Sequence, residues 1–144
     1  MFSKACEYAI KAIVFIAKGS LDGRRSNLKE IAKGIESPEA FTAKILQLLV
    51  KNQFIYSQKG AHGGFEMEQA KIKSLGLMAV VLAVDGDNLT NRCVLGLKQC
   101  SGINPCPFHE KYSPVRMNLI HILETTTIYD LAVGLISGRT SLKE

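Results

Sequence analysis

The sequence predicts a mostly α-helical protein with one small β-hairpin, an α+β fold. Through most of the chain, apolar residues recur at three- and four-residue spacing, which is the period of an amphipathic helix. Between residues 54 and 67 the period changes to two on either side of the glycine-rich segment 59–64, which is typical of two strands joined by a tight loop. The composition agrees, because 47% hydrophobic and 22% charged residues are typical of a folded globular chain.

Three helices are expected before the hairpin, over Ser3–Lys18, Leu28–Lys33 and Ser37–Asn52. Gly19 and Gly34 are expected to end the first two. Asn27, followed by a glutamate three residues later, predicts the N-cap of the second helix. Ser37 as N-cap and Pro38 in the first helical position predict the start of the third. This third helix is expected to bury Phe41, Ile45, Leu48 and Leu49.

The hairpin strands are expected over Phe54–Ser57 and Phe65–Met67. A very apolar fourth helix is expected over residues 74–84, followed by a break and by a loop rich in Gly, Pro and Cys over residues 89–110, here called the cysteine loop. The last two helices are expected over Ser113–Glu124, with an apolar face of Val115, Leu119, Ile122 and Leu123, and over Ile128–Val133, capped by Thr127.

The excess of positive charge lies in the first half of the chain. Residues 1–73 hold 12 Lys and Arg against 7 Asp and Glu, whereas residues 74–144 hold 6 of each, so the first half carries the whole net charge of +5. A basic region beside a neutral one suggests a polyanion-binding module next to a sensing or assembly module, although a solvated surface would give the same asymmetry. We therefore divide the chain into 1–73, 74–136 and a flexible tail over 137–144.

Three helices and a hairpin in a basic segment are the layout of a winged helix-turn-helix. In such a motif the second helix of the pair lies in the major groove of DNA. Here that helix is Ser37–Asn52, and its outer face is expected to carry Ala40, Ala43, Lys44 and Gln47. Gln can bind adenine and Lys can reach guanine or phosphate. An ordinary amphipathic helix would have the same polar side, and the hairpin is what favours DNA binding.

Further basic residues could contact the DNA backbone. Lys59 and His62 lie at the tip of the expected hairpin, a shape that suits a minor groove or a phosphate. Arg24, Arg25 and Lys29 could add salt-dependent phosphate contacts. A solvated surface charge is the alternative for each of them.

Cys93, Cys100, Cys106 and His109 are spaced C-x6-C-x5-C-x2-H within the cysteine loop. Thiolates bind soft and borderline metals, and this spacing lacks the close C-x2-C pair of structural zinc sites. Three thiolates with a fourth ligand other than Cys suit a 2Fe–2S cluster. The spacing barely separates that cluster from zinc, and a disulfide or a redox-sensing thiol stays open. Cys6 lies on the core face of the first helix and is expected to be a buried, inert thiol.

Three segments and the cysteine loop resemble the Rrf2 family of bacterial transcription regulators, which includes IscR-like and NsrR-like members. The segments are Ala5–Ala9, Pro38–Gln47 and Lys59–Phe65, and the resemblance extends over about Met1–Val133. The first cysteine gap, six residues, is one residue longer than in those members.

The resemblance implies a homodimer that forms through the long helix near Ser113–Glu124 and binds a palindromic operator in double-stranded DNA. It also implies that Cys93, Cys100 and Cys106 hold an iron–sulfur cluster. IscR-like members use a His after the third Cys as fourth ligand, which His109 matches. NsrR-like members use a carboxylate on the first helix of the partner subunit, and Glu7 stands at that position. We favour His109, because it is local.

The expected function is a DNA-binding transcription regulator, most simply a repressor, that senses iron–sulfur, redox or nitric-oxide status through a 2Fe–2S cluster. The alternative is a regulator that holds zinc, or no metal, and senses through its thiols. An enzyme is not expected, because the sequence has no P-loop, no HExxH and no GxSxG motif. We expect a cytoplasmic location without a membrane partner, since neither a signal peptide nor a membrane-length apolar run is visible.

Overall fold

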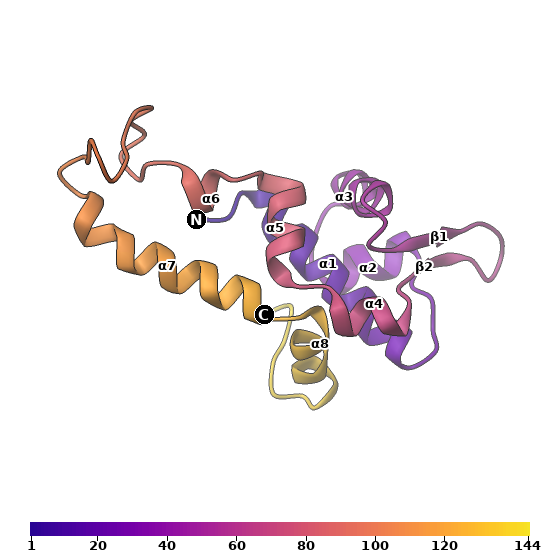
Figure 1. Cartoon of the computed structure of the whole chain (residues 1–144). Helices are drawn as coiled ribbons and strands as arrows, with labels where there is room; N and C mark the ends of the chain where they lie inside the picture. The colour runs from indigo at the N-terminus through magenta and orange to yellow at the C-terminus, as the bar shows by residue number, and fades with distance from the viewer.

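The computed structural model describes residues 1–144 as eight helices and one antiparallel hairpin (Figure 1). The prediction of a mostly helical fold with one small hairpin is confirmed. The elements are, in order, α1 (Lys4–Leu21), α2 (Leu28–Gly34), α3 (Glu39–Lys51), β1 (Tyr56–Gln58), β2 (Gly64–Glu66), α4 (Gln69–Ser74), α5 (Leu77–Asp85), α6 (Asn88–Asn91), α7 (His109–Thr125) and α8 (Ile128–Ile136).

Of the two glycines expected to end a helix, Gly34 does so and Gly19 does not. Helix α1 runs through Gly19 to Leu21, and a side chain at Gly19 would come within 3.1 Å of the Ser26 hydroxyl. Gly34 is the last residue of α2, and a side chain there would overlap the ring of Phe15. Both glycines therefore allow close approach of another part of the chain rather than a positive φ.

The N-cap predicted for α2 is confirmed, and the one predicted for α3 is wrong. The side chain of Asn27 accepts a hydrogen bond of 2.9 Å from the backbone N–H of Glu30. At α3, Pro38 occupies the N-cap position and offers no side-chain bond. The Ser37 hydroxyl instead contacts the hydroxyl of Thr42, which donates to the carbonyl of Pro38. Buried Thr42 and Leu46 replace the half-buried Phe41 and Leu48 in the expected core stripe.

The hairpin starts two residues later than predicted. Gln53 has a φ of 61° after α3, so Phe54 and Ile55 form the connection, in which Ile55 is fully buried. Strand β1 pairs with β2 in the register Tyr56 to Glu66. Ser26 forms an isolated antiparallel bridge with β2, because its backbone exchanges hydrogen bonds of 3.1 and 2.8 Å with Phe65. We call β1, β2 and the loop 59–63 the wing.

The helix predicted over 74–84 is α5, which begins three residues later, at Leu77. Helix α4 was not predicted, and a break at Leu75–Gly76 separates it from α5. The break is caused by a long-range bridge, because Gly76 pairs with Thr127 and the N–H of Leu77 donates to the carbonyl of Thr126 at 2.8 Å. The short helix α6 lies inside the expected loop and was not predicted.

Helix α7 begins at His109, four residues before the predicted Ser113. Pro114 lies inside it, in the second turn. Thr127 caps α8 as predicted, in a capping box with Asp130, and α8 continues to Ile136. In the tail, the N–H of Thr140 donates to the carbonyl of Gly134 at 3.2 Å and Leu142 packs against the core.

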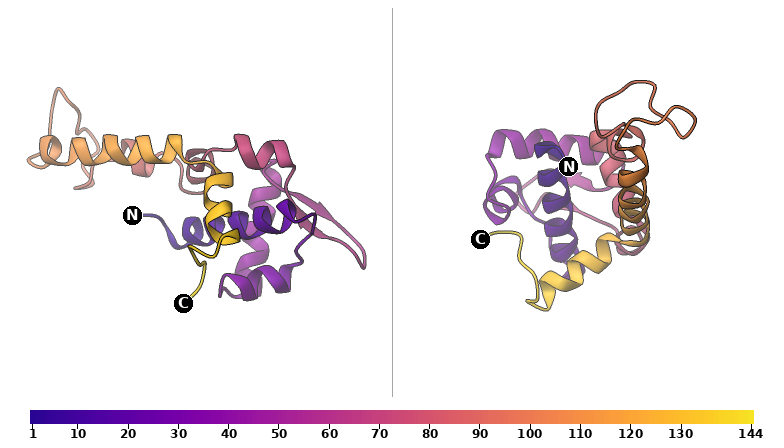
Figure 2. Two further views of the ribbon diagram at one scale, coloured as in Figure 1. Left: turned by 90° about the horizontal axis from the view of Figure 1, so that it is seen from below. Right: turned by 90° about the vertical axis from the view of Figure 1, so that its left-hand side faces the viewer.

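Helix α1 is the centre of one hydrophobic core that extends over both predicted regions. Its buried face, which includes Ile13 and Ile16, belongs to the same cluster as Val80 of α5, Leu123 of α7 and Ile128 of α8. Helix α7 then leaves this body as an arm, with Leu123 as its one buried residue (Figures 1 and 2). None of the helices combines the length and the apolar character that a membrane crossing needs.

Candidate nucleic-acid interface and metal centre

The outer face of α3 carries the four residues that the sequence analysis predicted to face DNA. Ala40, Lys44 and Gln47 are exposed, and Ala43 is half-buried. Ala43 and Gln47 also line a groove of about 420 Å³ between α3 and the wing, together with Leu28, Val50, Lys51, Ser57 and Phe65. Sequence reasoning did not select Lys51, although it follows Gln47 by four residues and so lies on the same face of the helix.

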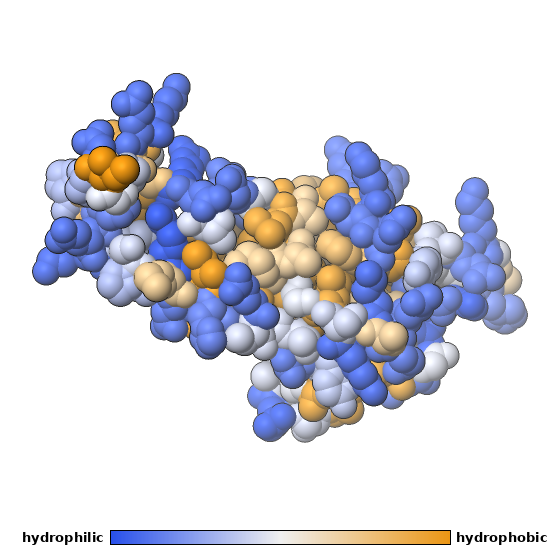
Figure 3. All heavy atoms as spheres, viewed as in Figure 1, coloured by the Kyte–Doolittle hydropathy of each residue, from blue (hydrophilic) through white to orange (hydrophobic).

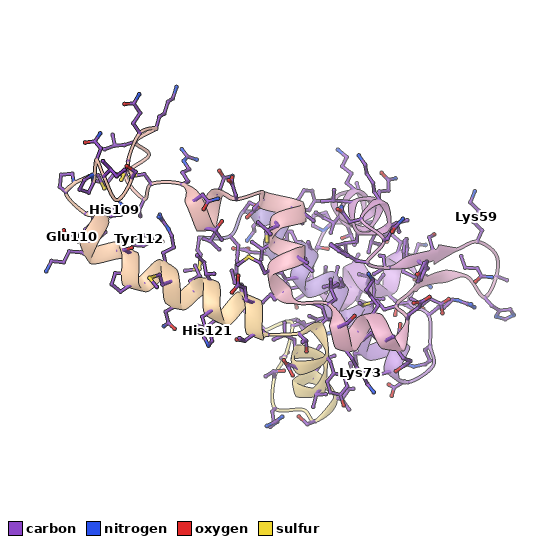
Figure 4. All side chains as sticks on the ribbon, viewed as in Figure 1. Lys59, Lys73, His109, Glu110, Tyr112 and His121 are labelled. Atoms are coloured by element: carbon purple, nitrogen blue, oxygen red, sulfur yellow. The ribbon has the colours of Figure 1, made fainter.

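The wing carries exposed basic and polar side chains at its tip. Lys59 and His62 are both exposed, and Lys59 points away from the hairpin at the end of the molecule opposite the arm (Figure 4). Gly64 holds the wing against the body, since its φ is 138° and a side chain would come within 2.7 Å of the carbonyl oxygen of Ser26.

Two of the predicted phosphate-contacting residues are already paired within the chain. The guanidinium of Arg25 meets the carboxylate of Glu66 at 3.2 and 3.3 Å. Arg24 lies 3.5 Å from Asp22 in a more exposed pair. Both arginines and His62 line one shallow cavity of about 530 Å³. Lys29 is exposed and makes no ion pair.

At the opposite end of the molecule the fold gathers the three loop cysteines. Cys93 follows α6, and Cys106 precedes the first turn of α7. The sulfur atoms of Cys93, Cys100 and Cys106 all lie within 4.8 Å of one another, and those of Cys93 and Cys106 are 3.7 Å apart. Four-coordinate metals hold thiolate sulfurs at about 2.3 Å, which places two sulfurs on one metal about 3.8 Å apart. The donor set therefore fits a thiolate-bound metal.

The loop backbone also favours thiolate at Cys93. Partial desolvation raises the pKa of this thiol, but hydrogen bonds from the backbone N–H groups of Leu97 and Leu95 and from the neighbouring thiols prevail and lower the pKa to about 7. The N–H of Cys106 donates to the sulfur of Cys100 at 3.4 Å. That bond lowers the pKa of Cys100, but burial and the adjacent thiols outweigh it, so this pKa is raised.

Both predicted fourth ligands have a defined place. His109, the first residue of α7, has its Nδ1 3.2 Å from the sulfur of Cys100 (Figure 4). Glu7 lies in the first turn of α1, half-buried, with its carboxylate 3.1 Å from Lys4. Within one chain the gathered group of potential ligands contains the three cysteines and neither His109 nor Glu7. Cys6 is fully buried as predicted, and burial, followed by nearby Asp85, raises its pKa to about 12.

Comparison with known proteins places this architecture in a family. The model of the Rrf2 family, described as an iron-dependent transcriptional regulator, matches residues 2–134. This chain belongs to the Rrf2 family. A relative from Aquifex aeolicus (strain VF5), named as an HTH-type transcriptional regulator, is 31% identical over 134 residues, which are 91% of this chain and 90% of the relative. The protein is therefore a transcription regulator and not an enzyme.

Solved Rrf2 structures share the fold at low sequence identity. CymR (YrzC), the global cysteine regulator of B. subtilis, superposes with a TM-score of 0.76 at 20% identity, covering 92% of this chain and 96% of that one. T. potens IscR superposes with a TM-score of 0.73 at 16% identity, covering 98% of this chain and 92% of that one. These values support the winged-helix fold with its arm.

Proposed function

We propose that this Rrf2-family regulator is a homodimeric repressor that binds a palindromic operator and controls that binding through a 2Fe–2S cluster on its cysteine loop. One observation carries the proposal. Three cysteine sulfurs within 4.8 Å of one another lie at the free end of the arm, while the basic α3 and wing lie at the other end of the same chain. The candidate thiolate centre and the candidate nucleic-acid surface therefore lie at opposite ends of one chain.

On the DNA side, α3 is proposed to enter the major groove. Lys44 and Gln47 are exposed one turn apart and suit guanine or phosphate and adenine, respectively. Ala40 and Ala43 are small enough to let the helix approach thymine methyl groups. The wing is proposed to reach a minor groove or a phosphate with Lys59 and His62. Lys29 adds a phosphate contact, and Arg24 and Arg25 do so if they exchange their carboxylate partners for phosphate.

On the sensing side, Cys93, Cys100 and Cys106 would hold the cluster, with His109 as fourth ligand. The 3.7 Å separation of the Cys93 and Cys106 sulfurs suits two ligands of one iron, and Cys100 with the nearby His109 forms the second pair. When bound, the cluster supplies one-electron redox chemistry and a site that oxidants or nitric oxide can attack. The match to an iron-dependent family and the fold shared with IscR support iron.

Helix α7 is proposed to be the dimer interface, because part of its apolar face stays exposed within one chain although Leu119 and Leu123 pack against the core. Val115 is 56% exposed and Ile122 is 49% exposed, and they lie two turns apart on the same face. Figure 3 shows apolar residues that continue over α5 beside the arm, where Leu82 is 43% exposed. A second copy packed there would bring each cysteine loop close to the partner subunit and fix the separation of the two α3 helices.

The proposed control of DNA affinity depends on the distance between the two α3 helices of the dimer. A symmetric dimer reads two half-sites whose spacing is fixed by the DNA. If the metal centre were lost or damaged, the metal would no longer hold residues 89–110 together, and the conformation at the start of α7 would change. A small shift of the dimer helix then changes the fit of both α3 helices to the operator.

Anaerobic purification followed by an absorbance spectrum, with iron and sulfide assayed on the same sample, tests the proposal. Visible charge-transfer bands with about two irons and two sulfides per chain are expected. His109→Ala is expected to change the spectrum, and Glu7→Ala is the comparison for a ligand from the partner subunit. His121→Ala is the matched control, because His121 is exposed on the same helix. Equal operator affinity of holo and apo protein in gel shifts at fixed salt would refute metal control.

The compact sulfur group favours one second candidate, a regulator that holds a single zinc ion. Sulfur atoms that all lie within 4.8 Å of one another also suit one tetrahedral metal. A colourless protein with about one zinc per chain, and no iron after reconstitution, would establish this candidate in place of the cluster.

A further inference from the structure

Arg116 is a cation of the arm that the proposed DNA and metal roles leave unexplained. It lies in the middle of α7, half-buried, and its guanidinium donates to the backbone carbonyl of Arg92, the residue directly before Cys93. The Nε of Arg116 is buried without any hydrogen-bond partner. The ion pairs of the chain involve Lys4, Arg24 and Arg25, so this guanidinium makes no ion pair.

The position of Arg116 is fixed by aromatic stacking along one side of α7. Its guanidinium carbon lies 5.2 Å from the centre of the Tyr112 ring, and that ring lies 6.1 Å from the ring of Phe108. These three residues are spaced four apart and therefore share one side of the helix. Phe108 directly precedes His109, so the row connects both ends of the cysteine loop.

A cavity of about 460 Å³ joins this row to the metal centre. Its lining includes Arg116, Tyr112, Cys93 and the loop residues Val94 and Leu95, and two further charged residues, Asp85 and Arg92, also line it. An iron–sulfur centre with three thiolates carries negative charge, and that charge increases on reduction. A partly buried, unpaired guanidinium beside Cys93 is therefore placed to stabilise the more negative state.

We propose that Arg116 is the positioning residue that clamps the Cys93 end of the cysteine loop to α7 and supplies positive charge to the centre held there. The charge role rests on the function proposed above, whereas the clamp does not require a bound metal. Because Arg116 belongs to the same helix as the dimer stripe, the clamp connects the state of the loop to the arm. Lysine can replace its charge but not its planar stacking and forked donors.

Limited trypsin digestion of the apo protein tests the clamp without iron. Lys98 is an exposed cleavage site inside the loop. Arg116→Gln removes a charge-assisted hydrogen bond, and cleavage after Lys98, followed by mass spectrometry, is expected to become about tenfold faster. Lys111→Gln, which removes an exposed charge from the same helix, is expected to leave the rate unchanged. Far-UV circular dichroism confirms that each variant is folded, and equal cleavage of wild type and Arg116→Gln overturns the clamp.

The reduction potential of the reconstituted protein tests the charge. Arg116→Gln is expected to shift the potential to a more negative value, because the reduced state loses a nearby positive charge. Arg116→Lys is expected to restore the wild-type potential but not the slow cleavage. An unchanged potential in Arg116→Gln overturns the charge role. A protein that never binds iron refutes the proposed cluster, while the digestion still decides the clamp.

Discussion

Cys6 and Cys93 differ in what surrounds the sulfur atom. Cys6 is fully buried in the core beside α5, and burial raises its pKa to about 12. Cys93 is partly exposed in a loop whose N–H groups point at the sulfur, and its pKa falls to about 7. Thiolate is the reactive form of cysteine, so these two residues are expected to differ greatly in reactivity.

We predict that iodoacetamide alkylates Cys93 of the metal-free protein and spares Cys6. A lowered pKa means that the thiolate forms as the pH rises through about 7, so the rate at Cys93 should increase across that pH and then level off. Cys6 should react only after unfolding. Peptide mass spectrometry at a series of pH values measures both rates. Native-state modification of Cys6 as fast as that of the loop would contradict the prediction.

Helix caps could be predicted from the local sequence, whereas the role of a glycine at a helix end could not. Asn27 and Thr127 cap their helices as predicted, because the N-cap bond involves a backbone N–H only three residues away. Gly19 was assigned as a helix stop, yet α1 continues past it, and a residue without a side chain is needed there for close approach to Ser26. That requirement comes from tertiary packing, which no local pattern contains.

At the scale of elements, the wing depends on one glycine. Gly64 combines a φ of 138° with a distance of 2.7 Å from an added Cβ to the carbonyl oxygen of Ser26. We predict that Gly64→Ala lowers the free energy of unfolding by about 1–3 kcal/mol, the usual cost of a strained backbone. Gly102→Ala is the control, because nothing lies within 4 Å of that position and its φ is not positive. Equal stability of the two variants in denaturant titrations would argue against the strain.

The wing tip gives a second prediction at this scale. Lys59 is exposed and unpaired, so its proposed partner is a phosphate rather than a base. Lys59→Ala is expected to weaken binding to specific and non-specific DNA alike and to reduce the salt slope by about 1. Gln47→Ala is expected to cost about 1–3 kcal/mol on the operator, with little effect on non-specific DNA. Fluorescence anisotropy with operator and non-specific DNA at several salt concentrations measures both effects. If both residues contact only phosphate, the two variants should lose the same affinity for operator and for non-specific DNA.

Helical period and the glycine-rich tip were sufficient to predict α1, α2, α3 and the hairpin. The later start of the helix predicted over 74–84 was not predictable, because it depends on the pairing of Gly76 with Thr127, far along the chain. At the candidate site, the spacing of the three cysteines was enough to select them. Arg116 was missed, since its contact with the carbonyl of Arg92 has no local sequence signature.

At the scale of the whole molecule, the winged helix and the arm share a core. Ile128 of α8 is fully buried and belongs to the same cluster as the inner face of α1 and α3. The DNA-facing elements therefore rest on residues from the far end of the sequence. A change of packing at α8 is therefore expected to alter the stability of the whole chain and not of the arm alone.

We predict that Ile128→Ala lowers the free energy of unfolding by about 2–5 kcal/mol, as for other large-to-small changes in a core. Unfolding should remain a single transition, and operator binding should be lost over the same range of denaturant. Ile136→Ala makes the same chemical change on the same helix at a residue that is 48% exposed, and it should cost far less. Circular dichroism and operator anisotropy along one guanidinium titration measure both quantities. Two separate transitions, with DNA binding retained after α8 has unfolded, would show that the winged region is stable without the core described here.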